Sequence, residues 1–206
     1  MLTVWGRANS INVQKVLWTL GELDQPFRRI DAGMAFGVND SPEYRAMNPT
    51  GLIPTIDDDG YVLWESNAIV RYLAAKHSFG TLYPADIGAR FQAERWMDWQ
   101  ATAFTAAITP VFLGLVRTAP EKRDAAAIEV ARQACEACLA ILDGHLADRQ
   151  YMGGDSLTIA DIPVGAGANR WYRLPVSRTP RPNVERWLAA LGERPAFTTH
   201  LEMLLS

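Results

Sequence analysis

Two polar segments of this chain stand where the hydrophobic pattern predicts that a helix begins. Ser10 directly precedes a run of apolar residues at helical spacing over residues 13–20, and Glu65 and Ser66 open a helix that extends to about Lys76. Unpaired N–H groups and the dipole at a helix N-terminus favour anions, so either segment could bind an anionic group. Serine is also a favoured N-cap, which would explain both serines without a ligand.

The cysteines and histidines do not form a reactive or metal-binding pattern. Cys135 and Cys138 fall on the apolar stripe of a helix predicted from Asp124 to Ala147. A redox CxxC pair needs a helix N-terminus to stabilise its thiolate, and this pair lies in mid-helix, so we expect two structural thiols. The histidines are scattered singly, and we expect no metal site: His77, His145 and His200.

The first part of the chain predicts a small α/β domain over residues 1–78. Strands are expected at Leu2 to Trp5 and Phe27 to Ile30 around the first helix, which gives a βαβ unit with parallel strands. A loop rich in Gly, Asn, Ser and Pro follows. Two β-prone runs flank an acidic turn that ends at Gly60, which is typical of an antiparallel hairpin. The sheet should therefore be mixed.

From residue 87 the pattern is helical only, after a linker predicted at 79–86. A long aromatic helix should run from Gly88 to Arg117 with a kink at Pro110. Thr158 and Asp161 resemble a capping box that begins a further helix, although Pro163 then removes a backbone donor inside it. Shorter helices follow to the end of the chain. Residues 87–206 thus predict an all-helical domain.

The composition excludes several classes of protein. The 206 residues carry a net charge of −3 and are 49% hydrophobic, so they can form a core and lack the basic surface of a nucleic-acid binder. The sequence has no continuous apolar stretch of about 18 residues, so a membrane span is not supported. Its start has no charged segment followed by an apolar block, so a secretory signal is not supported either. We expect a cytoplasmic protein.

The order of several short motifs now identifies a family. The chain resembles a glutathione transferase over essentially its whole length, of the bacterial, serine-type, theta- or beta-like kind. Each motif is weak alone, but their order and separation are specific. They are the segment Val4 to Val16 with Ser10, the run Asn48 to Pro54, Glu65 and Ser66 with Ala68, Ile69, Tyr72 and Leu73 behind them, and Ser156 to Asp161. The resemblance implies a thioredoxin-like N-terminal domain followed by a helical bundle.

The resemblance implies that the Ser10 hydroxyl donates a hydrogen bond to the glutathione sulfur. A free thiol has a pKa of about 8.5, and a helix N-terminus can lower it. A shift of about two units would raise the thiolate fraction at pH 7 from about 3% to about 75%. Asn12 and Asn9 are rival donors in the same loop, and Ser10 could still be only an N-cap.

Two further segments are implied to bind the rest of glutathione. A cis bond at Ile53–Pro54 would let the backbone of Ile53 pair with the cysteinyl unit as a short strand does. Ser66 and the helix N-terminus would bind the γ-glutamyl carboxylate, and Glu65 would face its ammonium group. Leu52 stands where several relatives carry a cation, so any contact to the glycine carboxylate must come from elsewhere; Arg7 and the loop from Asp31 to Asp40 are candidates, and the sequence assigns neither.

The electrophile should lie over the sulfur, beside the long aromatic helix. The candidate lining residues are Trp99, Ala103, Phe104 and Trp171, although aromatic residues at helical spacing are more often core. The predicted activity is conjugation of glutathione, as co-substrate, to small hydrophobic electrophiles in detoxification. The alternatives are a glutathione-dependent disulfide oxidoreductase and a non-catalytic binding protein. A homodimer is expected from the family and from Arg71, Arg90 and Trp96 near the domain junction.

Overall fold

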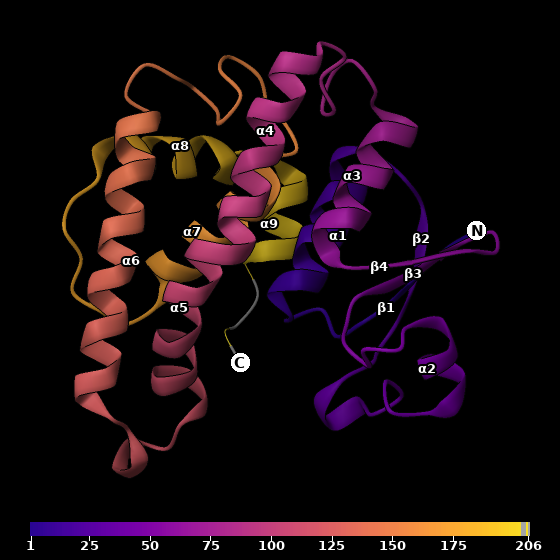
Figure 1. The fold of residues 1–206 in the computed structure, drawn as a ribbon, viewed down its shortest axis with the longest axis horizontal. Coiled ribbons are helices and arrows are strands. Elements are labelled where there is room, and N and C mark those ends of the chain that lie inside the picture. Colours follow the sequence, from indigo (N-terminus) through magenta and orange to yellow (C-terminus); the bar gives the residue numbers. More distant parts are fainter. Residues whose placement is uncertain (203–204, 206) are drawn as a thin grey trace. The chain divides into compact units, whose positions relative to one another are not determined.

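Four short strands form the sheet of the N-terminal unit in the computed structural model, which describes residues 1–202 and 205. They are β1 (Leu2–Trp5), β2 (Phe27–Ile30), β3 (Thr55–Asp58) and β4 (Tyr61–Trp64). The strand order is β2-β1-β3-β4, with β1 parallel to β2 and antiparallel to β3, and with β3 and β4 paired as an antiparallel hairpin. The predicted mixed sheet and thioredoxin-like topology are confirmed (Figure 1).

Helices α1 (Ile11–Glu22) and α3 (Ser66–His77) pack side by side against this sheet (Figure 1). The apolar faces of the two helices and of the central strands form one buried hydrophobic cluster between helices and sheet. Alternate residues of β1 and helically spaced residues of α1 contribute side chains to this cluster. Its buried members are Leu2, Val4, Val13, Val16, Leu17, Leu20, Ile56, Ile69 and Leu73. This cluster fixes the N-terminal ends of both helices relative to the sheet.

The segment between β2 and β3 is not the loop that the sequence predicts. It contains a short 3₁₀ turn, η1 (Met34–Phe36), and the helix α2 (Pro42–Met47). The hydroxyl of Ser41 accepts a hydrogen bond from the Tyr44 N–H at 3.2 Å, and Pro42 occupies the first helical position. A capping serine followed by proline is a helix-start pattern, but α2 is too short to show a periodic apolar face.

The last helix, α9 (Pro195–Leu201), packs on α1 and belongs to the N-terminal unit by its contacts. Phe197 meets Trp18 edge to face, with ring centroids 5.0 Å apart. The backbones approach closely at Gly21, where a Cβ would lie 2.9 Å from Ala196. The chain therefore returns to its first unit after the helices of the second, which comprises residues 80–194 and 205 among the described residues.

The second unit is helical, as predicted. It contains α4 (Ile87–Trp99), η2 (Gln100–Phe104), α5 (Thr105–Phe112), η3 (Leu113–Arg117), η4 (Pro120–Lys122), α6 (Ala125–His145), α7 (Asp161–Arg173) and α8 (Pro182–Gly192). α6 packs against α5 and α8. Cys135 is buried in α6 and Cys138 is half-buried, and burial raises the pKa of both thiols. The prediction of two buried thiols in mid-helix is therefore confirmed for Cys135 only, because Cys138 retains part of its exposure.

Residues 87–117 form one continuous helical run in which η2 and η3 are π-helical. Pro110, where the sequence predicts a kink, lies inside α5 between these two wide turns. The run has 31 residues, and its most apolar window has a mean hydropathy of 1.4, so length and composition alone would let it cross a bilayer. Its α5 portion packs on α6 and α7, as a core helix of a bundle does.

The start of α7 is organised by Asp161, which is completely buried. Its carboxylate accepts hydrogen bonds from the N–H groups of Met152 and Thr158, both at 2.8 Å, and from Trp187 Nε1 at 2.9 Å. Burial raises the pKa of Asp161 to about 6 even though these donors favour the charged form. Pro163 falls in the first turn of α7, where a missing N–H costs no helical bond, and this resolves the conflict seen in the sequence.

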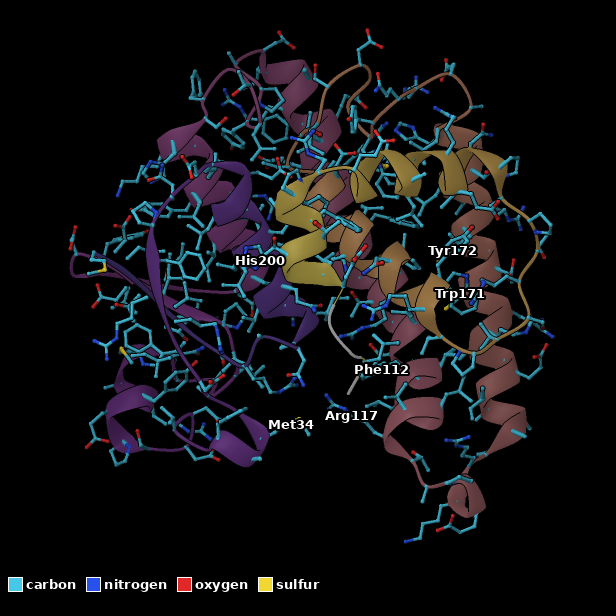
Figure 2. The ribbon with its side chains drawn as sticks, turned by 180° about the vertical axis from the view of Figure 1, so that it is seen from behind. Met34, Phe112, Arg117, Trp171, Tyr172 and His200 are labelled. Atoms are coloured by element: carbon cyan, nitrogen blue, oxygen red, sulfur yellow. The ribbon has the colours of Figure 1, made fainter. Side chains whose placement is uncertain are left out.

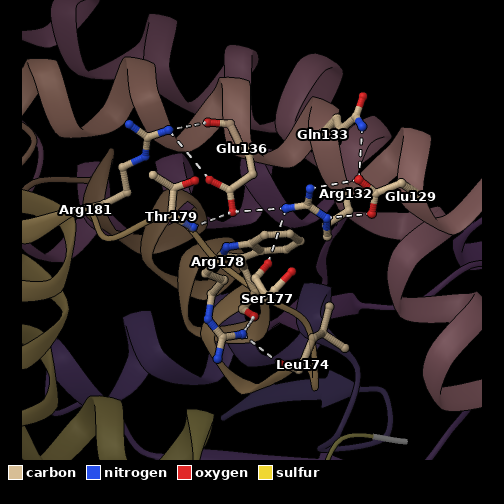
Figure 3. A network of polar contacts seen from close by, with 10 residues as sticks. Glu129, Arg132, Gln133, Glu136, Leu174, Ser177, Arg178, Thr179 and Arg181 are labelled. Carbon is tan, nitrogen blue, oxygen red and sulfur yellow. Dashed lines mark hydrogen bonds and ion pairs between the residues drawn. The ribbon is translucent and has the colours of Figure 1, made fainter.

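A polar network attaches the loop between α7 and α8 to α6 (Figure 3). The carboxylate of Glu136 accepts from the Thr179 N–H at 3.1 Å and pairs with Arg132 and Arg181. Arg178 donates to the carbonyl oxygens of Leu174 at 2.7 Å and Trp171 at 3.2 Å. Arg178 and Arg181 are thus committed to holding this loop.

Candidate functional site

Ser10 is the N-cap of α1, but its side chain makes no capping hydrogen bond. The backbone is extended there, with φ −79° and ψ 125°, and the carbonyl oxygen accepts the Gln14 N–H at 2.8 Å. The residue is 8% exposed. Serine is favoured at this position because its oxygen normally accepts from the second or third helical N–H. That reason does not apply here, so the hydroxyl is available to a ligand.

The two asparagines of the same loop have different surroundings. The Asn9 side-chain oxygen accepts a hydrogen bond from Arg7 Nη1 at 2.9 Å. Asn12 is exposed, in the first turn of α1, and its Oδ1 lies 3.4 Å from the Ser66 hydroxyl that donates to it. Asn12 therefore lies beside the start of α3.

The Ile53–Pro54 peptide bond is cis, as the resemblance implies. Pairing of β3 with both neighbouring strands begins at Thr55, so Ile53 lies before the sheet ladder. Two buried side chains, those of Tyr44 and Asn48, form hydrogen bonds to the turn that precedes Ile53. The Leu52 carbonyl oxygen accepts from the Tyr44 hydroxyl at 2.7 Å and from Asn48 Nδ2 at 2.9 Å. Burial also raises the pKa of Tyr44.

Glu65 precedes α3 in a conformation that is rare for a side-chain-bearing residue, with φ +71° and ψ 109°. Its carboxylate is exposed and makes no capping hydrogen bond, while its carbonyl oxygen accepts the Ile69 N–H at 2.9 Å. Ser66, the first residue of α3, is 6% exposed. The strained backbone thus presents an acid and a helix N-terminus to the same hollow.

That hollow contains about 270 Å³, including the space open to solvent. Its lining residues are Asn12, Asn48, Thr50, Leu52, Ile53, Pro54, Trp64, Glu65 and Ser66. The structure therefore brings together Asn12, Ile53, Pro54 and the Glu65–Ser66 pair, which the sequence places far apart. Asn9 and Ser10 do not line it; Ser10 lies at the start of α1, two residues before Asn12.

Three residues of this hollow were not assigned a role from the sequence: Asn48, Thr50 and Trp64. Asn48 and Thr50 form an internal turn, since Asn48 Oδ1 accepts the Thr50 N–H at 3.1 Å and its hydroxyl at 2.7 Å. The Asn-Pro-Thr-Gly run carries this turn pattern. Trp64 ends β4 and directly precedes Glu65, which brings it to the same hollow.

The candidate electrophile residues lie in the helical unit and differ in exposure. Phe104 and Trp171 are buried, at 0% and 1% exposed, which favours the core interpretation for both. Trp99 is half-buried and stacks on Phe104 with centroids 5.6 Å apart, and Ala103 is exposed. Only Trp99 and Ala103 thus retain surface for a substrate.

The fold and the site together define the glutathione transferase class. The defining features are the mixed thioredoxin-like sheet, the cis-proline before β3, the acid and serine at the start of α3, and the helical second unit. Residues 1–75 match the glutathione S-transferase N-terminal domain, and residues 103–195 match its C-terminal domain. The chain belongs to the glutathione S-transferase family and is a glutathione transferase, with glutathione as its co-substrate.

Individual relatives agree with this assignment. The chain is 45% identical over 198 residues to glutathione S-transferase GstB of Escherichia coli strain K12, covering 95% of each chain. Glutathione S-transferase 3 of Zea mays is 35% identical over 208 residues, which cover 95% of this chain and 91% of the relative. The theta class enzyme from Xanthomonas axonopodis pv. citri, solved with glutathione bound, superposes with a TM-score of 0.96 at 41% identity over 100% and 99% of the two chains.

Proposed function

We propose that Ser10 is the residue that activates the glutathione thiol in this transferase. The observation that supports it is the N-cap hydroxyl that makes no capping bond, at a helix N-terminus where an anion is favoured. With the sulfur held as a thiolate, its electron pair forms the new C–S bond to the electrophile, and the leaving group departs with the electrons of the broken bond. The thiol proton passes to solvent before the transfer. Asn12 is the rival donor.

The remainder of glutathione binds in the hollow described above. The γ-glutamyl carboxylate accepts from the Ser66 hydroxyl and from the first N–H groups of α3, and Glu65 faces the ammonium group. The backbone of Ile53, next to cis-Pro54, pairs with the cysteinyl unit. Most of the binding free energy should come from these contacts, because the charged ends of glutathione meet charge-assisted donors there.

The electrophile is a small hydrophobic molecule that is conjugated in detoxification, and the candidate lining residues that are not buried are Trp99, which is half-buried, and Ala103, which is exposed. We propose that the protein works in the cytoplasm and that it is a homodimer, the dimer being what the family resemblance implies. Light scattering should then give about twice the chain mass of 22.8 kDa at micromolar concentration. A mass equal to one chain would contradict the dimer.

Calorimetric titration with glutathione tests the binding residues. Glu65→Ala and Ser66→Ala each remove a charge-assisted partner, a loss of about 1.5 to 3 kcal/mol, so each should weaken binding at least tenfold. Glu43→Ala is the matched control, because Glu43 is an exposed acid in the first turn of α2. Unchanged affinity in both site variants would refute the assignment of this hollow to glutathione.

A further inference from the structure

The proposed placement of glutathione sets the direction in which its glycine unit lies. With the γ-glutamyl unit at the start of α3 and the cysteinyl unit on the backbone of Ile53, the third unit continues past Ile53, away from α3. The loop of residues 31–40 contacts Ile53, because a Cβ at Gly33 would lie 2.9 Å from Ile53 Cδ1, and Asn39 Nδ2 donates to the Gly51 carbonyl oxygen at 2.8 Å. None of the residues 31–40 lines the hollow that extends to α3. This loop therefore borders the glycine unit on the far side of Ile53.

Four large apolar side chains are exposed along this border. Leu52 is 66% exposed, and Met34, Phe36 and Val38 of the loop are 62%, 54% and 41% exposed. In Figure 2 the Met34 side chain extends outward from the ribbon of the N-terminal unit. The backbone holds these side chains outward at a cost, because φ is +54° at Met34 and +68° at Val38, which is a strained conformation for valine. Strain of this kind is concentrated at segments that contact ligands.

Neither the loop nor the hollow contributes a basic side chain. Residues 31–40 contain two aspartates and no lysine, arginine or histidine. The lining residues of the hollow, all of them in the described part of the chain, include the acid Glu65 and again no basic residue. These two segments therefore offer no cation to the carboxylate of the glycine unit.

Two arginines that flank the loop pair with its own aspartates. Arg29, in β2, pairs with Asp31 and also donates to the Gly6 carbonyl oxygen at 3.0 Å. Arg45, in α2, pairs with Asp40 at 3.0 Å. Each aspartate of the loop thus balances one arginine, and both arginines hold the loop in place.

We propose that this enzyme recognises its thiol co-substrate through the γ-glutamyl and cysteinyl units alone, and that it accepts amides and esters of the glycine carboxylate as readily as glutathione. The inference rests on the proposed function, because the binding of glutathione in the hollow sets the direction of the third unit. A carboxylate that a cation binds loses about tenfold or more in affinity when it becomes a neutral amide. A carboxylate that stays in water beside Leu52 and Met34 loses no such partner, and an ester can cover their apolar surface. The co-substrate class is therefore a γ-glutamylcysteinyl peptide with a charged or an uncharged third unit.

Calorimetric titration of the wild type with glutathione and with γ-glutamylcysteinylglycinamide tests this inference. The dissociation constant of the amide should lie within about threefold of that of glutathione, because no charge-assisted partner is lost. Leu52→Lys places a cation beside the third unit, so it should tighten glutathione binding about threefold and leave amide binding unchanged. Val130→Lys is the matched control, because it adds the same charge at a position of α6 that is 70% exposed, and it should change neither constant. Circular dichroism shows whether each variant is folded.

Arg7 is the further cation that this test must include. Its N–H donates to the Ala32 carbonyl oxygen at 3.1 Å, so Arg7 borders the loop, and its guanidinium donates to the Asn9 side chain at 2.9 Å. Arg7→Gln should change the two dissociation constants by the same factor. A loss confined to glutathione would assign the glycine carboxylate to Arg7 and overturn the proposal.

Two other results would also overturn it. One is an amide that binds the wild type more than about tenfold more weakly than glutathione, and the other is equal tightening of both thiols by Leu52→Lys. Ser66→Ala separates this inference from the proposed function, since it should weaken both thiols by one factor. If Ser66→Ala weakens neither thiol, the proposed function fails, and the comparison of the two thiols in the wild type still decides whether the glycine carboxylate is recognised.

Discussion

Replacing Ser10 by alanine separates the thiol-activating role from a helix-capping role, and Ser41 provides the matched comparison. Both serines are N-caps of helices in the same unit, but only Ser41 accepts a hydrogen bond from its helix. Loss of a working cap costs about 1 kcal/mol, so Ser41→Ala should lower the free energy of unfolding by that amount. Ser10→Ala breaks no capping bond and should change it by less than about 0.5 kcal/mol.

The effect on the thiol pKa should be the reverse of the effect on stability: large in Ser10→Ala and absent in Ser41→Ala. Ser10→Ala removes one donor to the sulfur but leaves the N-terminus of α1, so the pKa of bound glutathione should rise by about one unit, or about 1.4 kcal/mol. Conjugation at a pH below that pKa should fall roughly tenfold, because the thiolate fraction falls tenfold, and should recover as the pH rises through the new value. Ser41→Ala should leave the thiol pKa unchanged, and glutathione affinity should stay nearly intact in both variants.

The assays are urea unfolding and the ultraviolet absorbance of the bound thiolate against pH, for wild type, Ser10→Ala, Ser41→Ala and Asn12→Ala. If Ser10→Ala destabilises the fold as Ser41→Ala does and leaves the thiol pKa unmoved, the reasoning about Ser10 is refuted. A pKa raised only in Asn12→Ala would transfer the role to Asn12. A pKa unmoved in every variant would leave the helix N-terminus as the sole activator.

Two further predictions concern the helical unit. Asp161 has a pKa of about 6 in the folded state, so between its ordinary unfolded value and pH 6 only the folded chain holds the proton. Its contribution to the free energy of unfolding should therefore fall by about 3 kcal/mol as the pH rises from about 4 to above 6, and Asp161→Asn should remove that slope in urea titrations. At Gly167 a Cβ would lie 2.9 Å from the buried Phe104 ring, so Gly167→Ala should cost about 1 to 3 kcal/mol. Gly144→Ala, which meets nothing within 4 Å in α6, should instead stabilise by up to about 1 kcal/mol; equal thermal shifts would contradict this contrast.

Most elements could be predicted because each carries a local pattern of its own. The hairpin at Gly60, the helix after Ser10 and the long helix from residue 87 all combine a periodic apolar face with turn or cap residues. Helix α2 was missed because its six residues span less than two turns. The start of α7 was predicted two residues early: Thr158 was expected to be the N-cap, and it does form hydrogen bonds with Asp161, but the N-cap is Ala160 and the regular helix begins at Asp161.

The site was predictable in part for a different reason. Ile53, Pro54, Glu65 and Ser66 were found through the order of motifs, which encodes the family, and the hollow brings them together. Trp64 was not found in this way, because none of the motifs that carry the family resemblance includes it, although it directly precedes Glu65. The burial of Phe104 and Trp171 likewise follows from how α7 packs on the long helix, where Gly167 allows close approach to Phe104.

The backbone at Glu65 has a consequence for how this enzyme would respond to selection in the laboratory. With φ +71°, the position suits glycine better than any side-chain-bearing residue, and holding glutamate there costs on the order of 1 to 3 kcal/mol. A library screened only for survival of heating should therefore enrich Glu65→Gly, while one screened for turnover should retain the acid. Thermostable variants that keep their turnover would therefore have to obtain their stability at other positions.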